Sequence, residues 1–159
     1  MARQILKGLT MLMLVIGLAL ASAVAVNGQA NQKLIAQVPF DFIAANKNFR
    51  AGEYQVRAVN NAGDVLSIRS ADGRNQVLSL SDRTGLAKDQ REMKAKLVFH
   101  RYGNTYFLSQ VWMLGERTGR EIRKTRQERA IERELATIAS NRNLNEPLYE
   151  IVEVMATVR

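Results

Sequence analysis

The chain of 159 residues contains no cysteine, which excludes several kinds of function at once. Disulfide bonds, thiolate zinc sites, iron–sulfur clusters and thiol nucleophiles all need that residue. Many small exported domains are held together by disulfides, so this one must draw its stability from an ordinary apolar core. The chain also has a single histidine, His100, which excludes a zinc site built on a histidine pair.

Long apolar runs are equally scarce, and the one that exists lies at the N-terminus. Arg3 and Lys7 precede the uncharged stretch 9–26, whose last part consists of small residues. A basic start, an apolar middle and a small-residue end are the order of a secretory signal peptide. We therefore predict a signal peptide over residues 1–25. Three cleavage positions stay open, after Ala23, Ala25 or Ala30.

The predicted signal peptide also indicates the compartment in which the protein works. The stretch 9–26 is at the short edge of what spans about 30 Å of hydrocarbon, and no cluster of Lys or Arg follows it. We expect export by the general secretion route to the periplasm or the medium, with membrane contact only through the signal peptide. A short polar lead-in, residues 26–33, then precedes a single domain over residues 34–159.

Acidic residues are fewer than basic ones, 15 against 23, and the net charge is +8. Without Arg3 and Lys7 the basic residues fall to 21, so the net charge falls to about +6. A basic surface favours anionic partners. Because the protein is expected to be exported, we predict an anionic envelope component or another exported protein as partner, and no nucleic acid.

The pattern of residues 34–159 is that of an antiparallel β domain. Short runs of strand-forming residues alternate with turn residues at intervals of about ten. The expected strands are 34–38, 40–43, 53–59, 65–70, 76–80, 94–102, 105–113 and 148–155. A turn at 46–48 and a long loop at 81–92 separate some of them. We predict a mainly β fold, either an antiparallel β-sandwich or an open barrel of six to eight strands.

The strongest hairpin surrounds Gly103-Asn104, a two-residue turn that fixes the register. His100 then opposes Phe107, and Ser109 falls on the face opposite to His100. One face carries Leu97, Phe99, Tyr106, Leu108 and Trp112, and the other carries Val98, His100, Tyr102, Phe107 and Val111. Since both faces are largely apolar, we expect this hairpin to be covered on both sides.

The second cover is expected to be a helix over about residues 119–139. This stretch has no internal Gly or Pro, and Ile131, Leu135 and Ile138 recur with helical spacing. Its arginines alternate with glutamates, which favours a solvated helix and leaves an anion-binding helix as the alternative. We predict that this one C-terminal helix packs on the strands.

Several segments resemble a known group of proteins when taken together. They are 38–42 (VPFDF), 51–56 (AGEYQV), 68–74 (IRSADGR), 97–103 (LVFHRYG), 106–112 (YFLSQVW) and 119–121 (GRE). The set resembles a group of small exported bacterial proteins that have a signal peptide and no assigned activity. The resemblance implies export and a β-rich fold, and it implies no catalytic residues.

The candidates for chemistry in the chain are few. A histidine acting as general base needs a nucleophile and an orienting acid beside it, and sequence cannot show a triad around His100. The acidic residues fit turn formers better than a glycosidase pair. We therefore expect no catalytic residue, no metal and no cofactor. Residues that could contact a ligand or partner are His100, Arg101, Arg120, Arg123 and Arg126.

These observations lead to one functional prediction with two alternatives. We predict an exported non-catalytic β domain that binds a protein or an anionic envelope component. The first alternative is a hydrolase of envelope polymer that uses carboxylates in the loop 81–92. The second is a structural subunit that pairs through an exposed strand edge, at residues 34–38.

Overall fold

The computed structural model describes residues 32–60, 62–87, 93–142 and 147–159, and the side chains of 141 and 142 are not described. The predicted signal peptide and its three cleavage positions lie outside this part of the chain. Within it, no helix is both long enough and apolar enough to cross a membrane.

The described residues form one helix, α2 (Arg126–Arg142), and a set of strands. The strands are β1 (Lys33–Val38), β2 (Phe42–Ala44), β3 (Lys47–Phe49), β4 (Gly52–Ala58), β5 (Val65–Ser70), β6 (Gln76–Leu86), β7 (Lys96–Tyr102), β8 (Thr105–Trp112), β9 (Thr118–Ile122) and β10 (Glu150–Val158). The predicted mainly β class with a single C-terminal helix is confirmed.

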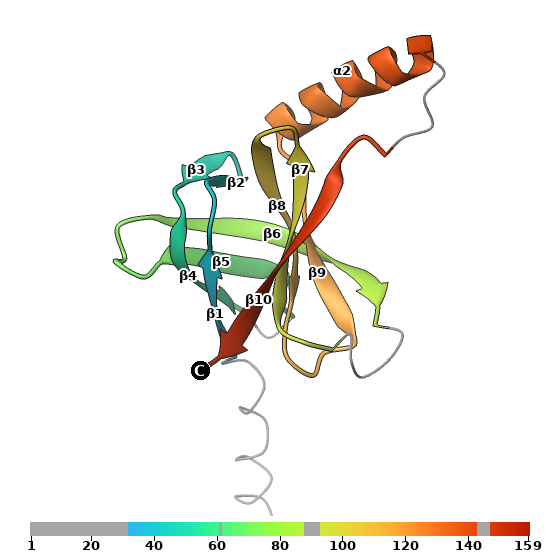
Figure 1. Cartoon of the computed structure of the whole chain (residues 1–159). Helices are drawn as coiled ribbons and strands as arrows, with labels where there is room; N and C mark the ends of the chain where they lie inside the picture. The colour runs from blue at the N-terminus through green and yellow to red at the C-terminus, as the bar shows by residue number, and fades with distance from the viewer. Residues whose placement is uncertain (1–31, 61, 88–92, 143–146) are drawn as a thin grey trace, which may run out of the picture. The chain divides into compact units, whose positions relative to one another are not determined.

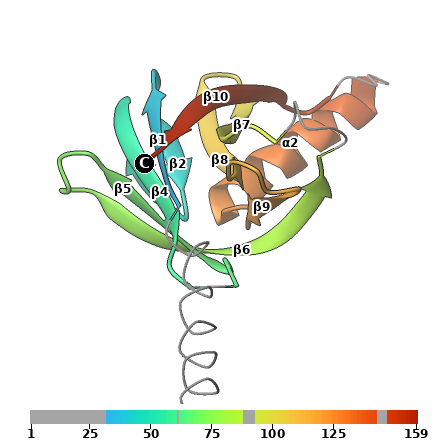
Figure 2. The ribbon, with the colours of Figure 1, turned by 90° about the horizontal axis from the view of Figure 1, so that it is seen from below.

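The sheet closes into an antiparallel barrel, which Figure 2 shows end-on. Around the ring the strands follow the order β1, β4, β5, β6, β9, β8, β7 and β10, and β10 pairs with β1. Gln110 and Val111 of β8 pair with Glu121 and Arg120 of β9, and this pairing closes the ring. Of the two architectures predicted, the structure has the barrel, and the barrel is closed.

Apolar side chains fill the inside of the barrel. Those with almost no exposed surface are Leu34, Val38, Phe49, Val56, Leu66, Ile68, Leu97, Phe99 and Val111. Phe42 contacts Phe49, Tyr54 and Phe99 ring to ring, at centroid distances of 4.9 to 5.3 Å. Burial of a large side chain of this kind stabilises a fold by about 1.5 to 3 kcal/mol. This core takes the place of the disulfides that the chain lacks.

The barrel leaves no free edge at residues 34–38, so the predicted pairing edge there is wrong. β1 pairs with β4 on one side and with β10 on the other. Strand β10, which runs three residues beyond its predicted end, occupies the edge that the sequence pattern left open. β3, in contrast, pairs only with β2.

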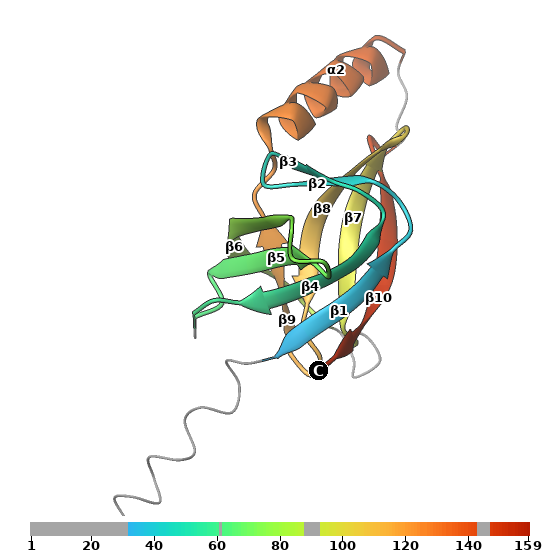
Figure 3. The same cartoon turned by 90° about the vertical axis from the view of Figure 1, so that its left-hand side faces the viewer.

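The β2–β3 hairpin turns one residue earlier than predicted. Ala45 and Asn46 have φ angles of 48° and 66°, so they form the turn, and Lys47–Phe49 returns as β3. Positive φ at both central residues fits the two-residue turn that matches the twist of the flanking strands. The hairpin lies beside β8, where Ile43 pairs with Phe107 in parallel (Figure 3).

Two longer predictions are also corrected. Residues 81–86 are not a loop, because β6 continues to Leu86 and pairs with β9; residues 88–92 lie outside the described residues. Residues 118–122 are not helical, because they form β9 and close the barrel. Both stretches are polar on their outer face, and local sequence cannot show that a distant strand will pair with them.

Helix α2 leaves the barrel near the ends of β7 and β8 (Figure 1). Only one side of the helix meets the barrel: Ile131 and Leu135 pack with Tyr149 on a small outer cluster of Ile43, Tyr102 and Phe107. The β7–β8 hairpin is therefore covered on both sides, as predicted, by the barrel core within and by α2 outside.

Candidate functional site

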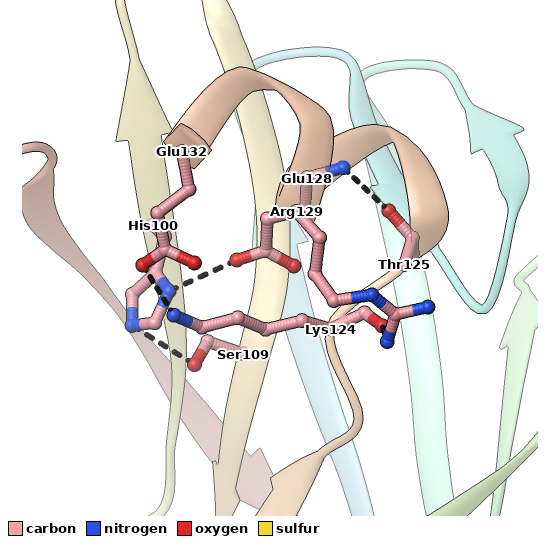
Figure 4. A network of polar contacts seen from close by, with 7 residues as sticks. All are labelled: His100, Ser109, Lys124, Thr125, Glu128, Arg129 and Glu132. Carbon is pink, nitrogen blue, oxygen red and sulfur yellow. Dashed lines mark hydrogen bonds and ion pairs between the residues drawn. The ribbon is translucent and has the colours of Figure 1, made fainter. Parts of the chain in front are cut away.

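His100 is the centre of a buried polar network between the barrel and α2, shown in Figure 4. Its Nδ1 lies 3.1 Å from Oε1 of Glu128, and its Nε2 lies 3.0 Å from Oγ of Ser109. With Glu128 ionised and His100 neutral, Nδ1 donates to the carboxylate and Nε2 accepts from the serine hydroxyl. A serine, a histidine and a glutamate in this order are the constellation of an acyl-transfer triad.

A β-bulge lies at Ser109, beside His100. Val98 pairs with Gln110 and Phe99 pairs with Leu108, so Ser109 is the extra residue of β8. An extra residue shifts every later side chain to the other face of the strand. Ser109 itself follows Phe107, the partner of His100, by two residues and lies on the face of His100, so the prediction of the opposite face is wrong.

The same shift corrects two further face assignments. Val111 was expected on the face of His100, but it belongs to the barrel core. Trp112 was expected on the face of Phe99, but its ring lies against Gly119 and Gly85, and its Nε1 donates to Gln110. The pairing of His100 with Phe107 precedes the bulge and is confirmed.

The helix cap holds Glu128 in position. Its backbone N–H donates to Oγ1 of Thr125 at 3.0 Å, which makes Thr125 the N-cap of α2. Glu128 is the acidic residue of the first turn, near the positive end of the helix dipole. The sequence signal was the spacing Thr-x-x-Glu, which commonly begins a helix. The prediction of a helix start at residue 119 overlooked it.

All three members of the network are shielded from solvent. His100 is 6% exposed, Ser109 is 4% exposed and Glu128 is 2% exposed. Tyr149 stacks on the imidazole, with ring centroids 4.0 Å apart. None of the three residues lines the open groove that lies at one end of the barrel.

Two ionisable groups lie beside the network. Burial raises the pKa of Tyr102, and the charges of Glu128 and Glu132 raise it further. For Lys124, burial opposes the charged form, but the hydrogen bond to Glu132 at 2.6 Å and the nearby carboxylates outweigh it, so its pKa is raised. The carboxylates of Glu128 and Glu132 therefore favour the neutral form of Tyr102 and the charged form of Lys124.

The five residues predicted to contact a ligand or partner have different surroundings in the structure and do not form one site. His100 is enclosed in the network just described. Arg101 pairs with Glu150 at 3.0 Å and donates to the backbone of Gly103. Arg123 is exposed but pairs with Asp82 at 3.1 Å, which raises the pKa of Arg123 through that hydrogen bond and the carboxylate charge.

Arg120 and Arg126 have opposite surroundings. Arg120 is 8% exposed, its guanidinium fills the space beside Gly63, and its Nη1 has no hydrogen-bond partner in the described structure. Arg126 is exposed at the start of α2. Of the five candidates, Arg126 alone is both exposed and without an ion-pair partner among the described residues.

Arg126 belongs to a basic face of α2 that the sequence prediction did not resolve. A helix advances about 100° per residue, so Arg126, Arg129 and Arg133 fall within about 60° of one another. All three are exposed. The acidic residues that separate them in sequence point elsewhere: Glu128 is buried with His100, and Glu132 pairs with Lys124. We call these three arginines the arginine face.

A separate open groove of about 950 Å³ lies at one end of the barrel. It runs between the β2–β3 hairpin, the start of β4, the β5–β6 turn and the β7–β8 turn. Its charged lining residues are Asp41, Glu53, Asp72, Arg50 and Arg74. Among the described residues, no three His, Asp or Glu side chains are arranged to hold a metal ion.

Comparison with protein-family models, with curated proteins and with solved structures finds no match for this chain. The resemblance to small exported bacterial proteins therefore stays a prediction. Three features of the described structure bear on function, namely the buried network, the arginine face and the open groove.

Proposed function

We propose that this protein is an exported, non-catalytic domain that binds an anionic component of the cell envelope through the arginine face of α2. The observation that carries the proposal is the separation of charge on the helix. Its arginines Arg126, Arg129 and Arg133 are exposed, with Arg129 donating one hydrogen bond to the carbonyl of Lys124 at 2.8 Å, while Glu128 and Glu132 are paired with His100 and Lys124.

This separation of charge gives α2 a basic face that the alternation of Arg and Glu in the sequence did not imply. Alternating Arg and Glu along a helix normally gives a neutral, solvated surface. Here Glu128 is removed from the surface by His100, and Glu132 is partly neutralised by Lys124. Three guanidinium groups remain within about two turns, and guanidinium binds phosphate and carboxylate through paired hydrogen bonds.

The buried network supports the proposal by fixing the orientation of the helix. Few apolar side chains of α2 contact the barrel, namely Ile131 and Leu135. The bond from Glu128 to His100 adds a directional contact at the first turn, so the arginine face is held outward. The His100 network thus has a structural role in this proposal, and the arginines make contact with the ligand.

Co-sedimentation tests the proposal with two anionic probes. These are vesicles containing phosphatidylglycerol and insoluble polygalacturonate, each compared with an uncharged counterpart. We expect binding to at least one anionic probe at about 0.1 M salt and its loss at about 1 M, where the Debye length falls from about 10 Å to about 3 Å. The probe that binds identifies the source of the anion, lipid headgroup or polysaccharide.

A matched pair of variants separates the arginine face from overall charge. The first replaces Arg126, Arg129 and Arg133 with Gln, and the second replaces the exposed barrel residues Arg57, Arg83 and Arg117 with Gln. Both lower the net charge by three. We expect about a tenfold or larger loss of affinity only in the first variant. Equal losses in both, or no binding by the parent protein, would contradict the proposal.

One observation favours the hydrolase alternative, although it differs from the form first predicted. The carboxylates expected in the loop 81–92 do not support it, because Asp82 lies on β6 and pairs with Arg123, and Asp89 and Glu92 lie outside the described residues. The Ser109, His100 and Glu128 geometry does support it. Labelling of the parent protein by a fluorophosphonate probe, lost in Ser109→Ala, would favour this alternative over a binding domain.

A further inference from the structure

The open groove at the end of the barrel is a second site, independent of the arginine face. We propose that it binds an uncharged, polyhydroxylated ligand, a segment of a neutral glycan. The proposal rests on the size of the groove, on the balance of its charges and on the number of hydrogen-bonding side chains it leaves without partners.

The groove has the dimensions of a ligand site and an unusual lining. Its volume of about 950 Å³ falls within the range of ligand pockets, which are mostly apolar. Here ten of the eighteen lining residues are charged, amide or aliphatic hydroxyl residues: Asp41, Asn48, Arg50, Glu53, Ser70, Asp72, Arg74, Asn75, Asn104 and Thr105. A lining of this kind offers a ligand many hydrogen-bonding groups beside its apolar surface.

The charges of the lining argue against an anionic ligand. Three carboxylates face two arginines, although the protein as a whole has a net charge of +8. Burial raises the pKa of the Tyr54 hydroxyl, and the charges of Asp41 and Asp72 raise it further. The floor of the groove is therefore locally negative within a basic protein, and the anions attracted by the arginine face are not favoured here.

Part of the wall is held rigid by internal hydrogen bonds. Asp41 accepts from the backbone N–H of Ala51 at 2.7 Å. Asp72 accepts from the hydroxyl of Ser70 and from the backbone N–H of Arg74. Tyr54 donates to the carbonyl of Arg50. These groups are already satisfied, so they shape the site, and no reorganisation is needed before a ligand enters.

Other side chains of the wall remain available for a ligand. Glu53, Asn48, Asn75 and Asn104 are exposed, and no side-chain hydrogen bond joins them to another described residue. An amide both donates and accepts, and a carboxylate accepts from two donors at once. Neighbouring hydroxyl groups of a sugar offer donors and acceptors in matching pairs. Tyr106, stacked on Phe40 at 3.9 Å, adds a fixed aromatic edge beside them.

A peptide ligand fits the groove less well. Strand addition needs a run of free backbone groups along a sheet edge. In the two-residue hairpin, Ala44 and Lys47 form the closing hydrogen-bonded pair, so in the alternating pattern only Asn48 of β3 turns its backbone groups away from β2. One residue of free edge is too short to hold an extended peptide, whereas side chains can hold sugar hydroxyls.

Titration of the purified ¹⁵N-labelled protein with uncharged hexasaccharides tests the proposal. The panel comprises oligomers of glucose, mannose, xylose and N-acetylglucosamine, with polygalacturonate fragments as the anionic comparison. We expect at least one neutral oligomer to bind with a Kd below about 1 mM and to shift the amides of residues 48–54, 70–75 and 104–106. The arginine-face variant should bind it as the parent does, which separates this proposal from the first.

Two groove variants and one control complete the test. Glu53→Ala and Asn104→Ala should each weaken binding about tenfold, the effect of one lost hydrogen bond of ordinary strength. Glu134→Ala removes an exposed carboxylate from α2, outside the groove, and should change nothing. The proposal is overturned if no neutral oligomer binds, if the shifts lie outside the groove, or if only the anionic fragments bind.

Discussion

Nε2 of His100 lies 3.0 Å from Oγ of Ser109, a residue that follows Phe107, the direct partner of His100, by two positions along β8 and therefore shares its face. Glu128 of α2 contacts the other ring nitrogen, Nδ1, at 3.1 Å. The three side chains thus join the β7–β8 hairpin to a helix that meets the barrel on only one side. Their hydrogen bonds are the basis of the first prediction.

Replacing His100 with Phe should destabilise the protein by about 2 to 4 kcal/mol, because it leaves the carboxylate of Glu128 buried without a donor. Glu128→Leu in the same background should recover most of this loss, because both polar partners are then gone. Urea unfolding of the two single variants and the double variant measures the coupling. If the losses of stability in His100→Phe and Glu128→Leu simply add in the double variant, the His100–Glu128 pair does not hold α2 to the barrel.

The effect of a substitution at Gly119 on stability should depend on Trp112, because the two residues are in close steric contact. A Cβ at residue 119 would lie 2.6 Å from the indole ring of Trp112, which is closer than carbon atoms can approach. Gly119→Ala should therefore cost about 1 to 3 kcal/mol, the usual range for overpacking. The chain has one tryptophan, so its fluorescence reports the displacement directly. In a Trp112→Leu background the same change should cost clearly less.

A substitution in the turn of the β2–β3 hairpin should stabilise the protein. Ala45 has a φ of 48°, a left-handed conformation that costs an L-residue about 1 to 2 kcal/mol and that asparagine tolerates better. Ala45→Asn should raise the free energy of unfolding by about 0.5 to 1 kcal/mol. Ala136→Asn, at an exposed site of α2, should lower it instead, because asparagine is the poorer helix former. Thermal unfolding distinguishes the two signs.

The parts of the fold that followed from sequence are those governed by local pattern. Alternation along residues 53–59 and the Gly103-Asn104 turn predicted β4 and the first half of the β7–β8 register correctly. Both signals act within one strand or one hairpin, where neighbouring residues decide the outcome. The mainly β class followed from the same kind of evidence.

The parts that did not follow depend on distant partners. Strand β9 was expected to be helical because its own residues favour a helix, but pairing with β6 and β8 overrides that preference. The bulge at Ser109 has no local signal either, since nothing in the hairpin sequence marks one residue as extra. Strand alternation from Phe107 would have put Ser109 on the face of His100, and the Thr125 and Glu128 cap had a readable signal, but neither pattern showed that α2 brings Glu128 to His100.

The arginine face illustrates the same limit at the level of charge. Counting Arg and Glu between residues 119 and 139 predicts a nearly neutral helix. The angles between Arg126, Arg129, Arg133 and the two glutamates are the same wherever the helix begins. What counting charges cannot show is that Glu128 and Glu132 are paired by His100 and Lys124, which leaves the arginines as the exposed charges between them.

The stability of the fold should fall in alkaline solution, and Tyr102 should contribute to the loss. Its pKa is raised by burial and by the charges of Glu128 and Glu132, so the folded state holds the phenol proton more tightly than the unfolded state does. A raised pKa in the folded state gives a contribution to stability that is fully present below the unfolded value of 10.0 and is lost as the pH rises above it. The raised pKa of Lys124 acts in the same direction above 10.5.

Tyr102→Phe isolates this contribution. The Tyr102 hydroxyl is buried beside Glu128 and makes no close hydrogen bond to a described residue, so its removal should change stability at pH 7 little. Above pH 10 the variant should lose less stability than the parent, because no phenolate has to form next to Glu128. Urea unfolding between pH 7 and pH 11.5 measures both effects. Parallel curves for the two proteins over that range would show that Tyr102 ionises as freely in the folded state as in the unfolded chain.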